Sequence, residues 1–255
     1  MNRYFQAEKM KYCHTFLPFL IILMPAVCVL LSAMMSYNYF VIDSYNWWYG
    51  TMFPGFTAIL CGMISSKDRK KQNRTVWALP VDTGKIWDAK LLLAAVAAAA
   101  AMVTATVLTV VGTELLRNGL HMTVLYVPNL SRQLLAAGII WATSLWQIPV
   151  CLFFSQKLGT PLTFLIHVSA IVLGGIMLSL TKWFFVLPHG ITNRAMCAVL
   201  GVLPNGLPAE PGSATYSPEL VKMSGVWIGL ASAILWFFLL WLLGRTWYKK
   251  QSERQ

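Results

Sequence analysis

The sequence predicts an all-α integral membrane protein, a bundle of six transmembrane helices with both ends of the chain in the cytoplasm. Of the 255 residues, 57% are apolar and only 11% are charged, whereas about a quarter are charged in an average soluble domain. Six stretches of the roughly 20 residues needed to cross a bilayer carry no charged side chain. The basic residues also gather on alternate sides of these stretches.

The six spans are expected near residues 16–36, 49–65, 90–114, 133–154, 162–187 and 225–244. The second is short, and Pro54 and Gly55 indicate either a kink in it or an earlier start near Trp47 and Trp48. The third contains an alanine run at 97–101, so it can pack closely against another helix of this chain or against a second subunit. The fifth is expected to continue past Lys182, because residues 183–187 are apolar and a lysine side chain can reach the headgroups.

The orientation follows from the distribution of positive charge. With the N-terminus inside, 15 of the 20 Lys and Arg residues fall in cytoplasmic segments, as the positive-inside rule requires. The longest inner loop is then 65–90, and the longest outer loop is 188–224, within a single transmembrane domain covering 1–255. Membrane sidedness accounts for the net charge of +11, so nucleic acid is not an expected partner.

Chemistry-bearing residues are sparse. The chain lacks zinc-protease, serine-hydrolase and phosphate-loop motifs, and its five cysteines form no CxxC pair. We therefore expect no catalytic residue, no metal and no cofactor in this chain, and any ATP to be used by another subunit. His167 lies well inside a span. It is expected to be hydrogen-bonded within the bundle, and a gate or proton relay is the alternative.

The inner loop 65–90 combines a basic stretch, 67–74, with a partly apolar one, 75–79, that ends at Pro80. This pattern predicts a short amphipathic helix, followed by a second helix capped by Asp82. Two interpretations remain open: a basic loop lying on anionic lipid, or a docking surface for a cytoplasmic partner. Trp77 and Leu79 favour the docking surface, because a solvated loop does not need large apolar side chains.

The outer side is rich in proline and aromatic residues. Residues 191–202 are apolar enough to form a short interfacial or re-entrant helix, and 203–208 read as successive turns. The aromatic residues between 37 and 49 are expected to form an exposed cluster, which is either an ordinary interfacial belt or a surface that contacts a ligand. The candidate ligand-contacting residues are Tyr45, Trp47, Trp48 and Asn205.

Three short motifs and the topology resemble the permease subunits of type-2 ABC exporters, most of all the small permeases of lantibiotic self-protection exporters. The motifs are Ala7-Glu8-Lys9-Met10-Lys11 before a helix with Pro25, Trp77-Ala78-Leu79-Pro80-Val81 followed by Ile86-Trp87-Asp88-Ala89-Lys90, and Leu203-Pro204-Asn205-Gly206. Related exporters often have a Glu-rich entry to the inner loop, whereas this chain has Lys-Asp-Arg-Lys-Lys-Gln at 67–72.

The resemblance implies an interfacial helix over residues 2–12 and a coupling helix that docks into a separate cytoplasmic ABC ATPase. The coupling residues would be Arg69, Arg74, Trp77, Leu79 and Pro80. Two permeases, often non-identical, would form the pathway in the bacterial plasma membrane, and the ATPase would bind ATP and Mg²⁺. The expected function is export of a membrane-active antimicrobial peptide, which protects the cell. The alternatives are export of another hydrophobic drug or lipid-linked compound, and a non-transporting scaffold or sensor.

Overall fold

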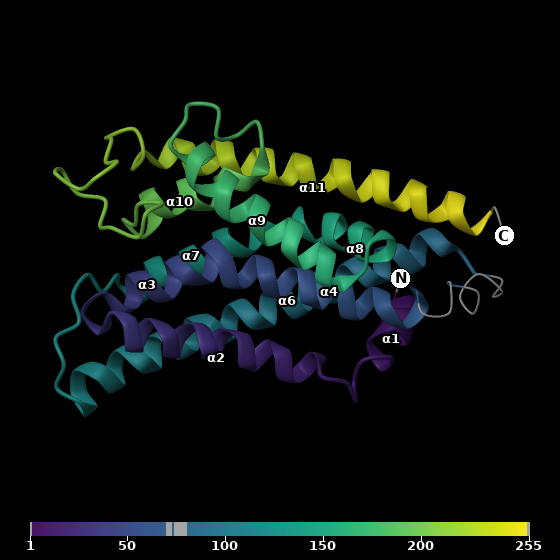
Figure 1. Ribbon diagram of the computed structural model, residues 1–255, viewed down its shortest axis with the longest axis horizontal. Coiled ribbons are helices and arrows are strands. Elements are labelled where there is room, and N and C mark those ends of the chain that lie inside the picture. Colours follow the sequence, from purple (N-terminus) through teal and green to yellow (C-terminus); the bar gives the residue numbers. More distant parts are fainter. Residues whose placement is uncertain (1, 70–72, 74–80, 254–255) are drawn as a thin grey trace.

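Helices run along the long axis of the computed structural model, which describes residues 2–69, 73 and 81–253 (Figure 1). Four described helices are long and apolar enough to cross a membrane: α2 (Leu17–Met35), α6 (Thr83–Glu114), α9 (Thr160–Ser179) and α11 (Met223–Ser252). A fifth results if α7 (Leu130–Ser144) and α8 (Gln147–Lys157) count as one bent span. The all-α membrane architecture is confirmed, whereas the count of six spans is not and stays a prediction, as does the orientation.

The second predicted span corresponds to α4 (Phe53–Arg69), which continues from α3 (Phe40–Trp47) through the π-helical turn η2 (Trp48–Met52). With 17 residues and a basic last turn, α4 is not one of the four long apolar helices. It packs instead among α6, α8 and α9, and most of its side chains are buried. A Cβ on Gly62 would lie 2.3 Å from Cγ2 of Thr160, so glycine is what allows α4 and α9 to approach this closely.

The alanine-rich helix α6 packs mainly against α2, α1 and α11 of the same chain. Ala94, Ala98 and Ala101 are buried, while Val96, Val103 and Val107 on the opposite face are exposed. Small side chains therefore face the neighbouring helices, where close packing stabilises helix association in lipid. Of the two partners left open by the sequence, a helix of this chain is the one that the structure shows.

The fourth predicted span, 133–154, is broken between α7 and α8, which are bent by 44°. Pro149 lies in the first turn of α8. Its ring would clash with the carbonyl of Leu145, four residues earlier, in a continuous helix. The break at residues 145–146 removes this clash, because proline is tolerated in a first helical turn.

The prediction that the fifth span continues past Lys182 is wrong, because α9 ends at Ser179. The carbonyl of Leu178 accepts from both the backbone N–H and the hydroxyl of Thr181, which closes a turn. The chain then folds back to the 3₁₀ turn η4 (Pro188–Gly190) and the short helix α10 (Ile191–Val199). Protein covers α10 on nearly all sides, as expected for the short segment predicted there.

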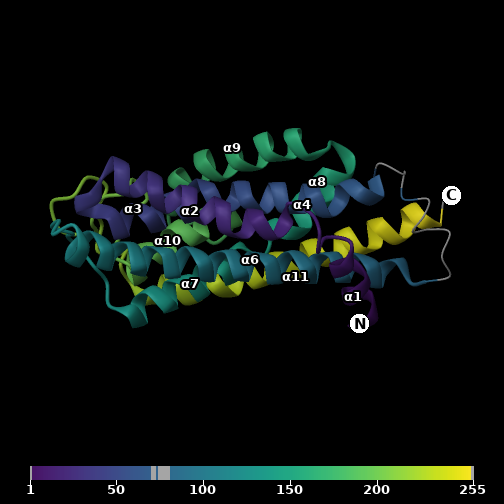
Figure 2. The ribbon, with the colours of Figure 1, turned by 90° about the horizontal axis from the view of Figure 1, so that it is seen from below.

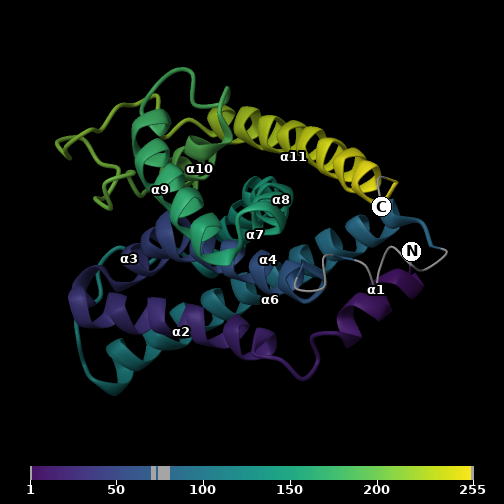
Figure 3. The ribbon, with the colours of Figure 1, turned by 45° about the vertical axis from the view of Figure 1, so that its right-hand side comes forward.

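Both described ends of the chain lie at the same end of the bundle (Figures 1 and 2). We call it the inner end, and the opposite end the outer end, after the predicted orientation. The inner end holds α1 (Asn2–Met10), the last turns of α4 and α11, and the first turn of α6. Helix α1 confirms the helix expected over residues 2–12, although its position in the membrane stays a prediction. Figure 3 shows α8 between α9 and α11. The opposite, outer end holds α3, α10 and the turns η1 (Tyr37–Tyr39), η3 (Leu115–Gly119) and η4.

Candidate functional site

Four charged side chains join three helices at the inner end. Lys90 of α6 is fully buried and pairs with Asp68 of α4 and, at 3.5 Å, with Glu8 of α1. Lys11 completes the group, with its Nζ 2.7 Å from Glu8 Oε1 and 3.3 Å from Asp68 Oδ1. We call these residues the inner quartet. Its two positive and two negative charges balance, which is what allows such groups to be buried.

The inner quartet lies immediately before the stretch expected to dock an ATPase. Burial by itself raises the pKa of the Asp68 carboxyl, but the ammonium groups of Lys90 and Lys11 outweigh this and hold the pKa below its ordinary value. Asp68 is therefore ionised at neutral pH. The Asp68 carbonyl also accepts from the N–H of Asn73 at 2.8 Å, so the quartet fixes the end of α4 from which residues 70–80 continue.

A second set of polar contacts joins α11 to the first turns of α6. Asp88 accepts from Nε1 of Trp241 at 2.7 Å and from Nε of Arg245 at 3.0 Å. Nearer the start of α6, Lys249 lies 3.6 Å from Asp82, and Asp82 caps the helix as predicted by accepting from the N–H of Gly84. Ionic contacts thus link α1, α4, α6 and α11 at the inner end.

Of the predicted coupling residues, Arg69 is the one that the structure describes. Its side chain is exposed and lies over the turn between α8 and α9, where a Cβ on Gly159 would be 2.5 Å from its Nη1. The φ of Gly159 is 90°, a conformation that favours glycine. Arg74, Trp77, Leu79 and Pro80 lie outside the described residues, so the predicted amphipathic helix there stays a prediction.

Two of the four candidate ligand-contacting residues do not lie on a surface of this chain. Tyr45 and Trp48 are 2% and 1% exposed. The Tyr45 hydroxyl reaches Gln133 at 3.4 Å, and the indole N–H of Trp48 points to the sulfur of Met102 at 3.2 Å. The prediction of an exposed aromatic cluster is therefore wrong for these two, and also for the buried Phe40 and Tyr49, because α3 turns one face inward against α6. Trp47, on the other face, is 38% exposed.

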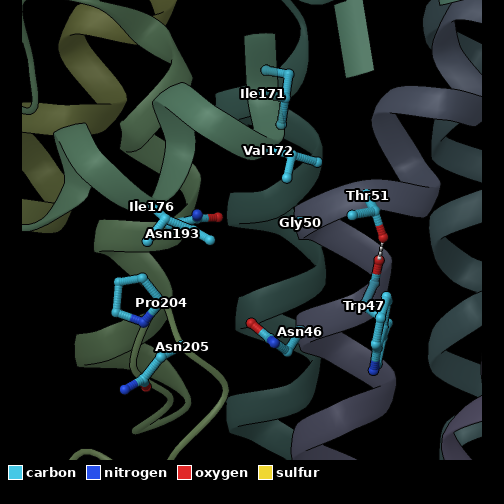
Figure 4. Close-up of a pocket in the computed structure, with 10 residues that line it drawn as sticks. All are labelled: Asn46, Trp47, Gly50, Thr51, Ile171, Val172, Ile176, Asn193, Pro204 and Asn205. Carbon is cyan, nitrogen blue, oxygen red and sulfur yellow. Dashed lines mark hydrogen bonds between the residues drawn. The ribbon is translucent and has the colours of Figure 1, made fainter. Parts of the chain in front are cut away.

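Trp47 and Asn205 come together at a cleft of about 270 Å³ on the outer side. Its walls come from α3 and η2, from α9, and from α10 with the turn after it (Figure 4). None of its lining residues is charged: Asn46, Trp47, Gly50, Thr51, Ile171, Val172, Ile176, Asn193, Pro204 and Asn205. We call it the outer cleft. Its apolar walls and amide groups can hold an amphipathic ligand without an ionic contact.

Asn205 lies at the outer cleft and also shapes its rim. Its side-chain oxygen accepts from the N–H of Leu207 at 3.1 Å, and its amide nitrogen donates to the carbonyl of Ala214 at 3.1 Å. Such side-chain to backbone bonds are typical of asparagine in turns. The next residue, Gly206, has a φ of 84°, which confirms the turn predicted at 203–208.

His167 is buried and its Nε2 lies 3.1 Å from Oε1 of Gln147 on α8. The ring also meets Trp146 edge to face, with 6.0 Å between the ring centroids. The expected role, a histidine hydrogen-bonded within the bundle, is confirmed. These contacts account for its burial without a gate or proton relay.

Sequence reasoning missed several of these residues. Lys90 was expected only to mark the start of a span, whereas it lies two turns inside α6 and is fully buried. Its partner Glu8 is far away in the chain, so spacing gives no sign of the pair. Asn46 and Asn193 were also missed. For Asn193, the signal was a polar amide within the apolar stretch 191–202.

Comparison with known proteins gives one match. The model of a family described as "ABC-2 family transporter protein" matches residues 16–204. This region contains the outer cleft's lining residues 46 to 204, together with Asp68 and Lys90 of the inner quartet. The searches of curated proteins and of solved structures returned no match.

Proposed function

Because this chain belongs to the ABC-2 family of transporter proteins, we propose that it is the membrane subunit of an ATP-driven exporter that expels a membrane-active antimicrobial peptide of the lantibiotic type. The chain is a multi-pass membrane permease and is not itself a catalytic subunit. ABC-2 permeases generally pair with an ABC ATPase. The direction of transport and the peptide substrate are the proposal.

The outer cleft is the observation that carries the proposal. Ile171, Val172 and Ile176 give it an apolar wall, and the amides of Asn46 and Asn193 face the same hollow (Figure 4). An amphipathic peptide that has partitioned into the bilayer presents an apolar face and backbone carbonyls and amides. These groups match the cleft, and a substrate recruited from lipid does not need a charged binding site.

The inner end suits the transmission of movement from an ATPase. In the proposal, the ATPase binds ATP and Mg²⁺ and pushes on the stretch around Arg69 to Leu79. Because the inner quartet ties the end of α4 to α1 and α6, displacement of this stretch moves three helices together. A second, non-identical permease would face this one and close the transport pathway.

The test is to express this chain with its ATPase and sister permease in a peptide-sensitive bacterium and to measure the inhibitory concentration of a lantibiotic. The complete exporter should raise it, and Trp47→Ala should remove at least about three quarters of the gain, because one wall of the cleft is lost. Trp227→Ala is the matched control, since Trp227 is 63% exposed on α11 and does not line the cleft. Unchanged sensitivity with all subunits assembled would exclude peptide protection.

Two further measurements, of dye accumulation and of ATP hydrolysis, separate the alternatives. If the assembled complex gives no protection against peptides but lowers the accumulation of an apolar dye, the substrate is a hydrophobic compound of another class. If ATP hydrolysis by the complex responds to neither, the scaffold or sensor function is favoured.

Pairing with the ATPase has its own test. Replacing Trp77 and Leu79 by Asp is expected to abolish co-purification of the ATPase, because charge would replace the apolar side chains of the predicted docking surface. Replacing the exposed Trp183 and Phe185 of the outer side by Asp is the control and should leave the ATPase bound. Intact binding in the first variant would contradict the docking assignment.

A further inference from the structure

A buried arginine at the outer end lines a pocket other than the outer cleft. Arg194 of α10 is 8% exposed, and its guanidinium lies over the ring of Phe184, 5.0 Å from the ring centroid. Its Nη1 donates to the carbonyl of Ser179 at 3.1 Å, and its Nη2 donates to the carbonyl of Glu219 at 2.9 Å. Arg194 thus joins the end of α9 to the segment that precedes α11.

These contacts use only part of the hydrogen-bonding capacity of Arg194. A guanidinium has five N–H donors, and two backbone carbonyls account for two of them. Its Nε is buried and has no hydrogen-bond partner. Among the described residues no carboxylate forms an ion pair with it; the Glu219 carboxylate acts on it only from a greater distance. Unlike most buried charged groups, the Arg194 guanidinium therefore keeps a buried N–H donor, Nε, that no described residue accepts.

Arg194 lines a pocket of about 300 Å³ that offers further donors. Lys182 is exposed at its edge. The hydroxyl oxygen of Thr215 accepts from Asn205, so its hydrogen can be donated, and Ser217 supplies a second hydroxyl. Glu219 is an acidic lining residue. Together, Arg194, Lys182 and Glu219 give the pocket a net charge of +1. The other lining residues are Leu180, Thr181 and Leu220.

We propose that this pocket binds the phosphate group of a ligand, and we call it the phosphate pocket. A guanidinium, an ammonium and two hydroxyls can together address three or four oxygens around a phosphorus atom, and arginine matches phosphate geometry especially well. The proposal concerns a site separate from the outer cleft and does not depend on what the transporter exports.

The surroundings of the phosphate pocket favour a lipid headgroup as the source of the phosphate. The adjoining segment exposes apolar side chains, with Trp183 69% and Val186 48% exposed. It lies along α11, where Trp236 donates to the carbonyl of Val186 at 3.1 Å. Exposed apolar side chains next to a tryptophan are typical of the membrane interface. A phosphate bound to Arg194 would therefore sit at headgroup depth, with its acyl chains beside this segment.

The proposal is tested on the purified full-length chain by native mass spectrometry in detergent. The probes are dioleoylphosphatidylglycerol, dioleoylglycerol, which has the same chains without phosphate, and inorganic phosphate. The phosphatidylglycerol should bind at least about tenfold more tightly than dioleoylglycerol, as expected for loss of charge-assisted hydrogen bonds. Displacement of the lipid by millimolar inorganic phosphate would support the site and identify a soluble phosphate as a competing ligand. Absence of displacement would assign it to lipid headgroups.

Variants locate the binding. Arg194→Gln should weaken phosphatidylglycerol binding about tenfold or more, whereas Arg132→Gln, which removes an exposed outer charge, should not. Because Arg194 also holds two backbone carbonyls, the double variant Lys182→Gln with Ser217→Ala gives a second test at residues that hold no such buried contact, with an expected loss of about fivefold. Equal binding of dioleoylglycerol and phosphatidylglycerol, or unchanged binding in both variants, would overturn the proposal.

Discussion

The two ends of the bundle differ in whether their buried charges are paired. At the inner end, Glu8, Lys11, Asp68 and Lys90 neutralise one another inside the protein. At the outer end, the cleft has no charged lining residue, and the buried Arg194 has no carboxylate paired with it among the described residues. Paired charges fix helices to one another, whereas an unpaired charge or an uncharged cleft leaves groups available to a ligand.

This difference fits a transporter that is moved from one end and binds its ligands at the other. The inner contacts resist separation of α1, α4, α6 and α11, because pulling one partner out would leave a buried charge alone. The outer end contains successive turns in place of long helices, so its contacts can rearrange at lower cost. Substitutions that weaken the contacts of one end or the other test this difference.

The largest effect is expected at the inner quartet. Lys90→Met leaves the carboxylate of Asp68 buried without its nearest partner and Glu8 with Lys11 alone, which should lower the free energy of unfolding by about 3–5 kcal/mol. The measurement is unfolding of the purified chain in mixed micelles by titration with a denaturing detergent. Lys85→Met is the control, because Lys85 is exposed on the same helix. Equal stability of the two variants would show that the quartet does not hold the inner end together.

The contacts between α11 and the start of α6 should contribute less to the free energy of unfolding than the inner quartet does. Asp88→Asn removes the charge that faces Arg245 and should cost about 1.5–3 kcal/mol, since its carboxylate is 13% exposed and accepts two hydrogen bonds. Asp82→Asn should cost less than about 1 kcal/mol, because Asp82 and Lys249 are 34% and 40% exposed and water screens such pairs. The same unfolding titration checks this order, and a reversed order would mean that burial does not set the strength of these pairs.

An effect on stability well below that of the inner quartet is also expected at the outer end. Gly206 and Gly212 have φ values of 84° and 101°, so alanine at either position should cost about 1 kcal/mol in backbone strain. Only a Cβ on Gly206 would meet a neighbour, Nδ2 of Asn46 at 3.0 Å. Gly206→Ala should therefore also reduce transport, measured as protection against the peptide, whereas Gly212→Ala should not. Equal transport in both would argue against Asn46 as a cleft residue.

Much of the fold was predictable because it follows from composition and spacing. Charge-free stretches identified α2, α6, α9 and α11. Most of the ends of these helices were predicted to within a few residues. The end of α9 was not predictable in this way, since residues 183–187 are as apolar as a helix in lipid, and the turn at Thr181 is closed by local hydrogen bonds of its backbone N–H and hydroxyl. The central position of α4 was equally hidden, because it depends on which helices surround it.

The candidate sites were less predictable than the fold. Trp47 and Asn205 were selected from sequence and meet at the outer cleft, but Tyr45 and Trp48 were selected for the same reason and are buried. An aromatic residue near an interface looks the same in sequence whichever way its helix faces. Asn46 and Asn193 lie far apart in the chain, so their meeting at one cleft had no local signal.

The sequence by itself determined that this protein is an all-α membrane protein, because a chain with so few charges and such long apolar stretches is stable only with its helices in lipid. It also located the basic loop and the short segment before the last helix. Only the tertiary structure decided which charges are paired and which are not. Lys90 and Arg194 are both basic residues beside apolar stretches, and their difference arises from what the fold places around them: two carboxylates around Lys90, and two backbone carbonyls with an open pocket around Arg194.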